Sequence, residues 1–322
     1  MRTVFLGTSA FAAAVLERLA TGEHRPALAL TRPDRPRGRG RKLGAPPVAQ
    51  AAGRLGIALE QPANVNDAPA RELIAQARPD AVIVCAFGAL IREPLLSEHE
   101  LLNVHPSLLP RWRGAAPVER AIMAGDERTG VSIMRLTAGL DSGPVCLAQS
   151  LPIDPYDCYG SLAERLQALG GELIVRALDL VARGGPLPFV EQTEDGVTYA
   201  EKIGPEDRLL DPARPAEELE RVVRALHPHI GARIALADGA LLGVHRARML
   251  ADASATGLAP DGADADSGDE RGAARRGVTE RDGRLLLDCA PGMLELLEVQ
   301  PPGGRAMDAS AYLRGHGLPG RR

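Results

Sequence analysis

Three polar residues of this 322-residue chain have types and spacing that suit acid/base chemistry. Asn103 and His105 are separated by one residue, and Asp141 lies in the glycine-flanked turn Gly139–Gly143, where no helix blocks a carboxylate. An amide can donate to an oxygen that gains negative charge, and a carboxylate beside an imidazole fixes its tautomer and favours its charged form. We therefore expect an external amine to attack a carbonyl while the protein stabilises the oxyanion and moves a proton.

The segment from Ser107 to Pro110 is expected to form an apolar wall of the same pocket. Prolines restrict the backbone on both sides of Leu108 and Leu109, which then form a rigid shelf. Ser107 is not a predicted nucleophile, because no G-x-S-x-G turn surrounds it, and its hydroxyl is expected to bond within the turn. A histidine two residues after an asparagine is, taken alone, more often structural than catalytic. The prolines and the exposed aspartate turn favour the catalytic interpretation.

A basic loop from Thr31 to Lys42 is the second candidate feature, with six basic residues and one acidic residue. A generic basic run is more often a solvated surface loop. Here glycines keep the loop pliable, prolines hold it extended, and it follows a strand on the side of the expected crevice. It could therefore grip a phosphate backbone. Its candidate binding residues are Arg35, Arg37, Arg39, Arg41 and Lys42.

Composition excludes several classes of protein. A formal net charge of -4 and a pI near 6.0 argue against indiscriminate nucleic-acid binding through an all-basic surface, so a polyanion would need a local patch. Four cysteines show no C-x-x-C pair and no histidines at zinc-ligand spacing, so we expect buried thiols and no metal. No window reaches the roughly 18 apolar residues of a membrane span. The N-terminal run also lacks a cleavage site, and we expect a cytoplasmic protein.

The order of predicted elements indicates two domains of an α/β protein. Up to about residue 182, short β-rich runs alternate with helical segments, which is typical of a Rossmann-like open, mostly parallel sheet. Short strands with Gly-rich turns follow and predict a smaller C-terminal OB-like β-barrel. We predict a catalytic domain over 1–183, a linker over 184–206 and a second domain over 207–322, with 251–276 disordered. The predicted strands include 3–6, 28–30, 81–85 and 101–104, and the predicted helices include 47–55, 67–77 and 161–181.

Six stretches of the chain together carry a resemblance to a known family. They resemble the methionyl-tRNA formyltransferases, within the folate-dependent formyltransferases, over nearly the whole chain. The resemblance implies that 10-formyltetrahydrofolate donates a formyl group to the α-amino group of methionine on initiator methionyl-tRNA, for translation initiation. The stretches are Leu6–Thr8, Thr31–Leu43, Asn103–Asp126, Thr129–Met134, Gly139–Gly143 and Thr198–Ile203.

The resemblance also implies a role for each matching residue. Asn103, His105 and Asp141 match the catalytic trio of the family. Arg39 aligns with a basic-loop arginine used near the acceptor end of the tRNA, and the second domain is similar to a barrel with further tRNA contacts. No metal is implied, and nothing in the sequence requires more than a monomer. The folate-contacting residues implied are Ser107, Leu108, Leu109, Pro110, Phe87, Gly88 and Leu90.

Four alternatives stay open on the sequence. A glycinamide ribonucleotide formyltransferase would use the same trio but should have a glycine-rich phosphate loop, which Gly7-Thr8-Ser9 does not supply. A sugar-nucleotide formyltransferase could keep the trio and an extra domain, although the dense basic loop counts against it. A formyltetrahydrofolate hydrolase would use water as the acceptor and is expected to have a regulatory domain before the sheet. A non-enzymatic RNA-binding protein would not need the intact trio.

Overall fold

The computed structural model describes residues 1–37, 42–250 and 277–316. The predicted disorder of 251–276 therefore falls outside the described residues. The chain forms two compact units. The first comprises Met1–Pro117, Glu127–Ile153 and Leu162–Glu201, and the second comprises Val118–Asp126, Asp154–Ser161 and Lys202–Arg322.

A seven-stranded sheet in the order β10-β9-β7-β6-β1-β2-β5 forms the centre of the first unit. Five neighbouring strands are parallel, whereas β9 runs antiparallel to β7 and the edge strand β10 runs antiparallel to β9. The buried apolar runs of β1 and β6 explain their central place, because parallel strands are covered on both faces. The bounds are β1 Thr3–Gly7, β2 Pro26–Leu30, β5 Ala58–Glu60, β6 Ala81–Cys85, β7 Leu101–His105, β9 Arg128–Arg135 and β10 Val145–Pro152.

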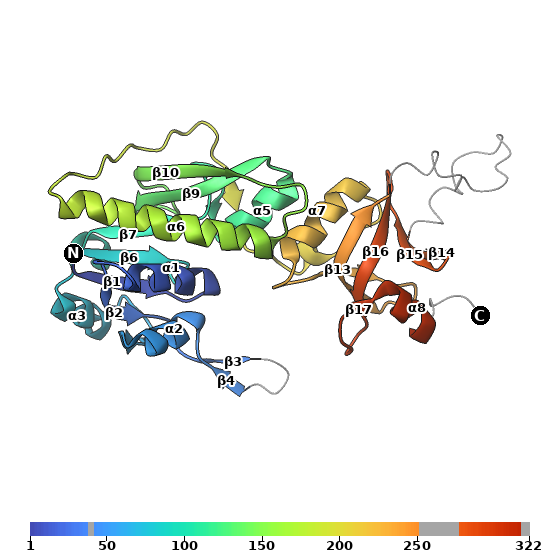
Figure 1. Ribbon diagram of the computed structural model, residues 1–322, viewed down its shortest axis with the longest axis horizontal. Helices are drawn as coiled ribbons and strands as arrows, with labels where there is room; N and C mark the ends of the chain where they lie inside the picture. Colours follow the sequence, from blue (N-terminus) through green and yellow to red (C-terminus); the bar gives the residue numbers. More distant parts are fainter. Residues whose placement is uncertain (38–41, 251–276, 317–322) are drawn as a thin grey trace. The chain divides into compact units, whose positions relative to one another are not determined.

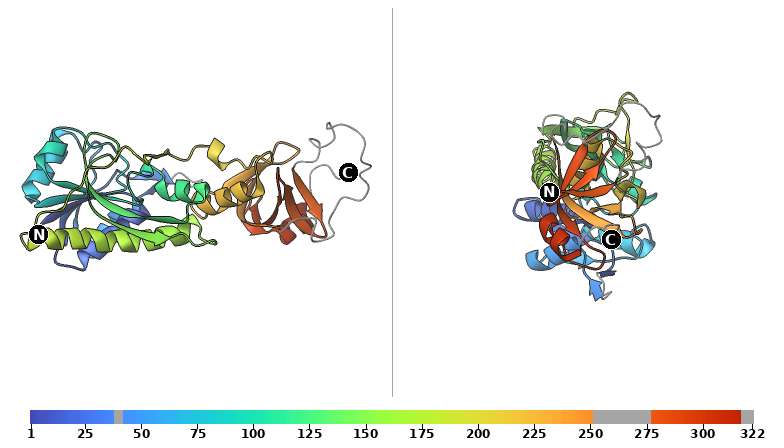
Figure 2. Two further views of the ribbon diagram at one scale, coloured as in Figure 1. Left: turned by 90° about the horizontal axis from the view of Figure 1, so that it is seen from above. Right: turned by 90° about the vertical axis from the view of Figure 1, so that its right-hand side faces the viewer.

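Helices cover both faces of this sheet (Figures 1 and 2). On one face, α6 approaches β7 so closely that a Cβ on Gly170 would lie 2.9 Å from Val104 Cγ1. On the other face, Ile74 of α3 packs in a core cluster with Val84 and Leu101. Because side chains alternate along a strand, Asn103 and His105 share the face of Leu101. The helices of this unit are α1 Ala10–Ala20, α2 Pro47–Leu55, α3 Ala68–Ala77, α4 Leu95–Glu98 and α6 Tyr159–Ala182, whereas α5 Pro117–Ala124 lies mainly in the second unit.

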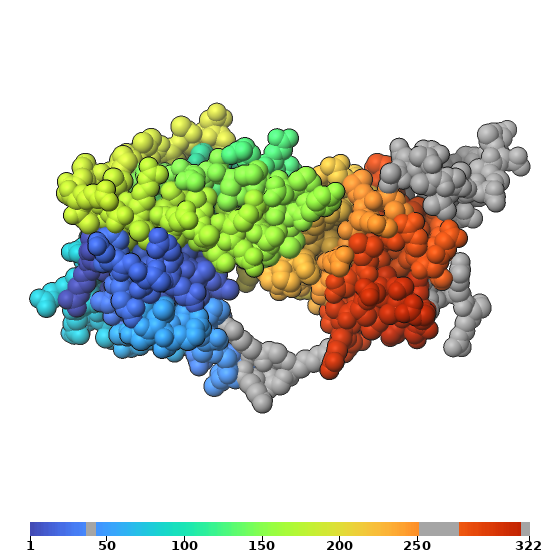
Figure 3. Space-filling view, in the orientation of Figure 1, coloured from blue at the N-terminus to red at the C-terminus, as the bar shows by residue number. Residues whose placement is uncertain are grey.

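Two small strand pairs complete the first unit. β3 (Arg35–Arg37) and β4 (Lys42–Gly44) form an antiparallel hairpin that projects from the rest of the unit (Figures 1 and 3). β8 (Arg113–Gly114) pairs in parallel with β11 (Tyr199–Ala200), so the chain that follows α6 returns to the loop after β7.

An antiparallel half-barrel sheet in the order β12-β13-β16-β15-β14, with β17 beside β16, forms the second unit. Leu219, Val222 and Leu226 of α7 recur at helical spacing and pack against Leu242 and Val244 of the sheet. These contacts form the hydrophobic core of the second unit. The elements are η1 Glu206–Arg208, α7 Ala216–Leu226, β12 Ala232–Ala235, β13 Leu241–Met249, β14 Val278–Arg281, β15 Arg284–Asp288, β16 Met293–Gln300, β17 Met307–Asp308 and α8 Ala309–His316.

The predicted fold class is confirmed: a mostly parallel α/β sheet and a smaller C-terminal antiparallel half-barrel. The helix over 47–55 and the strand over 81–85 have the predicted bounds. Ser9 Oγ accepts from Ala12 N at 3.2 Å and caps α1. Among the residues described, no helix has the length and apolar character needed to cross a bilayer.

An ion pair within the second unit predicts a pH-dependent stability. Asp207 accepts from the Arg120 guanidinium of α5 at 2.7 and 3.0 Å, and Arg120 holds the pKa of that carboxyl below its ordinary value of 3.8. A lowered pKa means that the stabilisation is present above the unfolded-state pKa and is lost as the pH falls through the folded-state pKa. We expect Asp207→Asn to lower the free energy of unfolding by about 1–2 kcal/mol at neutral pH.

Denaturant unfolding over a pH series checks this prediction. The difference between wild type and Asp207→Asn should shrink as the pH falls below 3.8. The exposed Asp195 provides a charge-matched control, and Asp195→Asn should leave stability nearly unchanged. A difference between wild type and Asp207→Asn that is constant over the whole pH range would contradict the ion-pair explanation.

Candidate active site

The structure brings the three predicted polar residues together on one face of the first sheet. Asn103 Nδ2 lies 3.4 Å from Asp141 Oδ1, and His105 Nδ1 lies 3.6 Å from Asp141 Oδ2. Asn103 and His105 are only 8% and 4% exposed, so the site is shielded from bulk water. Leu136 N donates to Leu101 O at 2.9 Å, and the chain from there to Asp141 folds back over β7. The Asp141 carboxylate therefore lies on the face of β7 that carries Asn103 and His105.

The two imidazole nitrogens of His105 have different partners. His105 Nε2 lies 2.9 Å from the carbonyl oxygen of Trp112, which can only accept, so Nε2 carries a hydrogen. The nitrogen that can gain or lose a proton is then Nδ1, which faces Asp141. The sequence predicted that a carboxylate would fix the tautomer, but the backbone carbonyl of Trp112 makes the contact that does so.

Main-chain contacts hold Asp141 in its turn. Gly114 N donates to Asp141 Oδ2 at 2.9 Å. Asp141 has φ +44°, a left-handed conformation that costs energy for a residue other than glycine. A Cβ on Gly143 would lie 2.1 Å from the carbonyl oxygen of Arg135, so only glycine fits where the turn rejoins the sheet.

The predicted apolar segment after β7 is fixed by a buried serine that sequence reasoning missed. Ser132 Oγ donates to Ser107 O at 2.8 Å and accepts from Leu109 N at 3.2 Å. Ser107 is fully buried, and its own hydroxyl donates to Arg111 O at 2.6 Å, within the turn as expected. Leu108 packs so closely on β9 that a Cβ on Gly130 would lie 2.5 Å from it. Gly130 and Ser132 lie in Thr129–Met134, one of the stretches that resemble the family. That resemblance could have indicated their importance.

The loop after β6 contains the other three predicted folate contacts. Phe87 is buried with the apolar cluster of the sheet face that carries His105, and its carbonyl accepts from Thr8 Oγ1 at 2.7 Å. Gly88 has φ +74°, and its carbonyl accepts from the Arg32 guanidinium. Leu90 is 60% exposed. Gly88 and Leu90 are thus accessible to a ligand, whereas the Phe87 side chain supports the loop.

The predicted phosphate-binding residues lie on and beyond the β3–β4 hairpin. Arg35 is exposed on β3. Only the backbone positions of Arg37 and Lys42 are described, while Arg39 and Arg41 lie outside the described residues. The structure therefore shows where this basic segment leaves the sheet and that its first strand, β3, pairs with β4.

Two polar residues in the predicted linker also contact the site. Gln192 Nε2 donates to Asp141 O and Gly143 O, each at 2.8 Å. Thr198 Oγ1 accepts from Trp112 N at 2.9 Å. The family-like stretch that begins at Thr198 is a signal for that residue, whereas no pattern in the sequence singles out Gln192.

The thiols and possible metal ligands form no second reactive centre in the described part of the chain. No group of three or more His, Cys, Asp or Glu residues there could hold a metal ion. Cys85 and Cys146 are buried as expected, and burial raises the pKa of the Cys146 thiol to about 11. Cys158 and Cys289 are only partly buried, because they lie in loops beside α6 and β15.

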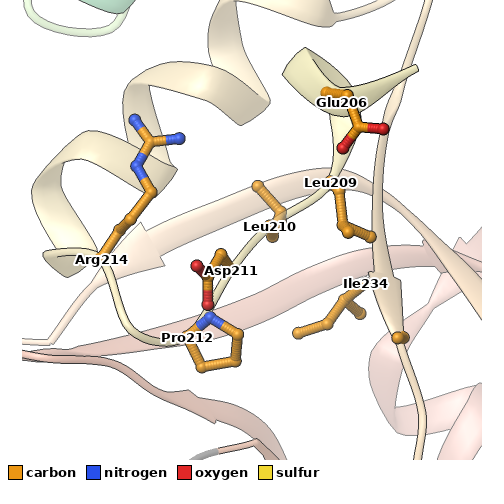
Figure 4. Close-up of a pocket in the computed structure, with 8 residues that line it drawn as sticks. Glu206, Leu209, Leu210, Asp211, Pro212, Arg214 and Ile234 are labelled. Carbon is orange, nitrogen blue, oxygen red and sulfur yellow. The ribbon is translucent and has the colours of Figure 1, made fainter.

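A pocket of about 350 Å³ in the second unit is lined by other types of residue than the site around Asp141 (Figure 4). Glu206 and Asp211 contribute carboxylates to it, and Figure 4 shows the Arg214 guanidinium pointing away from Asp211. Arg214 pairs with Glu218 at 3.1 Å, so its charge is compensated. The pocket has none of the three polar residues and does not suit a phosphate.

Comparison with known proteins agrees with this geometry. The sequence pattern of the formyl transferase family matches residues 1–178, and that of the formyl transferase C-terminal domain matches residues 202–317. The chain is 41% identical over 321 residues to a methionyl-tRNA formyltransferase of Halorhodospira halophila, covering 98% of this chain and 97% of the relative. It is 37% identical over 318 residues to one from Neisseria meningitidis, with the same coverage.

A solved structure shows the same fold at lower identity. HypX from Aquifex aeolicus, in complex with tetrahydrofolic acid, is 16% identical and superimposes with a TM-score of 0.64, covering 99% of this chain and 48% of that chain. At this identity the likeness concerns the fold alone. The family matches and the near full-length relatives, however, show that this chain belongs to the formyl transferase family, and within it to the methionyl-tRNA formyltransferases.

Proposed function

We propose that this chain transfers the formyl group of 10-formyltetrahydrofolate to the α-amino group of methionine on initiator methionyl-tRNA. The observation that carries the proposal is the buried contact of Asp141 with both Asn103 and His105, in a chain 41% identical to a methionyl-tRNA formyltransferase. Folate as the donor is supported by family membership, and the HypX structure of the same fold is a complex with tetrahydrofolic acid.

The geometry suits acyl transfer without a covalent enzyme intermediate. The α-amine attacks the formyl carbon, which becomes tetrahedral, and the π electrons of the C=O bond move to its oxygen, which becomes an oxyanion. Asn103 Nδ2 directs one hydrogen to Asp141 and has a second with which to donate to that oxyanion. When the bond from the formyl carbon to N10 of the folate breaks, N10 gains the proton that the amine loses.

His105 Nδ1 is the group that moves this proton in the proposed mechanism. His105 Nε2 is bonded to Trp112 O, so proton exchange is confined to the nitrogen that faces Asp141. The nearby carboxylate stabilises the imidazolium that forms when Nδ1 takes the proton. Neither Asn103 nor His105 needs to act as a nucleophile.

The folate is proposed to bind between the two loops that follow β6 and β7. Leu108, Leu109 and Pro110 are half-buried and form the apolar shelf, while Gly88 and Leu90 are exposed on the neighbouring loop. Ser107 and Phe87 support these loops from beneath, because both side chains are buried.

The tRNA is proposed to contact the basic hairpin and the C-terminal domain, 207–322. Arg35, Arg37, Arg39, Arg41 and Lys42 would neutralise phosphates near the acceptor end. A sugar-nucleotide acceptor is less suitable, because it presents too few phosphates for such a dense basic segment. Acting on a tRNA for translation, the protein would work as a cytoplasmic monomer.

Formylation of initiator against elongator methionyl-tRNA tests the acceptor. We expect kcat/KM to be at least about 100-fold higher for the initiator, since rejecting a related tRNA requires a difference of a few kcal/mol. A quench assay with radiolabelled methionine and 10-formyltetrahydrofolate measures the rate. Equal rates with both tRNAs, or transfer to an amino sugar nucleotide instead, would contradict the proposed acceptor.

Replacement of Asp141 tests the proton-transfer step. Asp141→Asn removes the charge that faces His105 Nδ1, so kcat should fall by about 10²- to 10⁴-fold. Folate binding, measured by titration calorimetry, should stay close to that of wild type, since Asp141 is not assigned to the folate shelf. The exposed Asp195→Asn variant is the control. Unchanged turnover in Asp141→Asn would rule out the assigned role.

Replacement of Arg39 tests whether the basic loop binds tRNA. If this residue contacts a tRNA phosphate, Arg39→Ala should raise KM for the tRNA, and the slope of log(kcat/KM) against log[salt] should decrease by about 1. KM for folate should not change. A variant whose tRNA kinetics match wild type at every salt concentration would instead identify the loop as an ordinary solvated surface.

A further inference from the structure

The Gln192 side chain holds the turn that contains Asp141. Its Nε2 donates to the carbonyl oxygens of Asp141 and Gly143, each at 2.8 Å. Its Oε1 accepts from Arg113 Nε at 3.0 Å. Since the guanidinium can only donate and the two carbonyls can only accept, the amide has one orientation that satisfies all three contacts. Gln192 is therefore fixed at both ends.

This amide clamp acts where the backbone is strained. Asp141 has φ +44°, and such a conformation persists only when its surroundings over-determine it. The two carbonyls that Gln192 binds lie on either side of Ser142, so the clamp fixes the turn just after the Asp141 Cα. The direction in which the carboxylate points toward His105 depends on that backbone.

Thr198 makes the corresponding contact on the other side of the site. Its Oγ1 accepts from Trp112 N at 2.9 Å, and its carbonyl accepts from Arg113 N at 2.9 Å. Trp112 also has a left-handed backbone, with φ +63°. The carbonyl of Trp112 is the acceptor for His105 Nε2, so Thr198 sets the position of the group that fixes the tautomer.

We infer that Gln192 and Thr198 are positioning residues for formyl transfer: Gln192 directs the Asp141 carboxylate, and Thr198 places the Trp112 carbonyl that orients His105. The segment from Val190 to Ala200 is then part of the reaction site. This inference rests on the proposed function and adds two residues to it. Neither side chain is placed against the reacting atoms. Gln192 acts through the main chain of the Asp141 turn, and Thr198 acts through the main chain of Trp112, which bonds His105.

Two substitutions at Gln192 separate the clamp from simple packing. Gln192→Glu keeps an acceptor for Arg113 and nearly the same volume but has no N–H to donate to the turn, whereas Gln192→Ala removes all three contacts. We expect both variants to lower kcat by about 10- to 100-fold, with KM for folate and for tRNA unchanged within about threefold. Gln149→Ala, at an exposed glutamine of the same unit, should retain wild-type kcat.

Substitutions at Thr198 have a spectroscopic readout. Trp112 is the only tryptophan in the chain, so the intrinsic emission reports its surroundings directly. Thr198→Val keeps the shape of the side chain but cannot accept from Trp112 N; it should shift the emission and lower kcat by about 10- to 100-fold. Thr198→Ser should restore both. Gln192→Ala should lower kcat with a smaller emission shift than Thr198→Val, because the hydrogen bonds of Gln192 go to Asp141, Gly143 and Arg113, whereas Thr198 bonds Trp112 N directly.

The outcomes distinguish this inference from the proposed function. Wild type that transfers no formyl group to initiator methionyl-tRNA contradicts the function itself. Active wild type together with full kcat in Gln192→Glu overturns the clamp, and full kcat in Thr198→Val overturns the second contact. Rates are measured well below the melting temperature of each variant. They are divided by the concentration of folded protein, which circular dichroism determines. A loss of kcat that disappears under these conditions would also overturn the inference.

Discussion

The hydrogen bond from His105 Nε2 to the carbonyl oxygen of Trp112 decides which imidazole nitrogen can exchange a proton. Because Nε2 is occupied, the free nitrogen of the imidazole is Nδ1, which faces the Asp141 carboxylate at 3.6 Å. The left-handed backbone of Trp112 and the Thr198 contact behind it are requirements of this one bond.

The topology of the sheet makes such an arrangement possible. Asn103 and His105 project from the same face of β7, and the turn that contains Asp141 joins β9 to β10, two strands that pair antiparallel. A parallel neighbour would need a crossover connection, usually a helix, at this point. The antiparallel edge therefore lets a short glycine-flanked turn bring Asp141 to the strand.

Local patterns could be predicted from the sequence, but contacts between distant segments could not. The helix at 47–55 follows from Pro47 in its first turn and Gly56 after its last, and the strand at 81–85 follows from its continuous apolar run. The chemistry of the trio also follows from residue types. Gln192 and Thr198, by contrast, lie 51 and 86 residues from their partners Asp141 and Trp112, and spacing carries no information at that range. The composition of 184–206 predicted a linker, so these two residues were not expected at the site.

The size of the strain explains why these distant contacts are needed. A non-glycine residue in the left-handed region costs of order 1–3 kcal/mol. One hydrogen bond contributes a net of about 0.5–1.5 kcal/mol, so the single bond from Gly114 N to the Asp141 carboxylate does not reliably offset that cost. Two further bonds from Gln192 bring the total to the same magnitude as the strain. The Asp141 turn is thus held by a few hydrogen bonds, and Gln192 in the segment after α6 donates two of them.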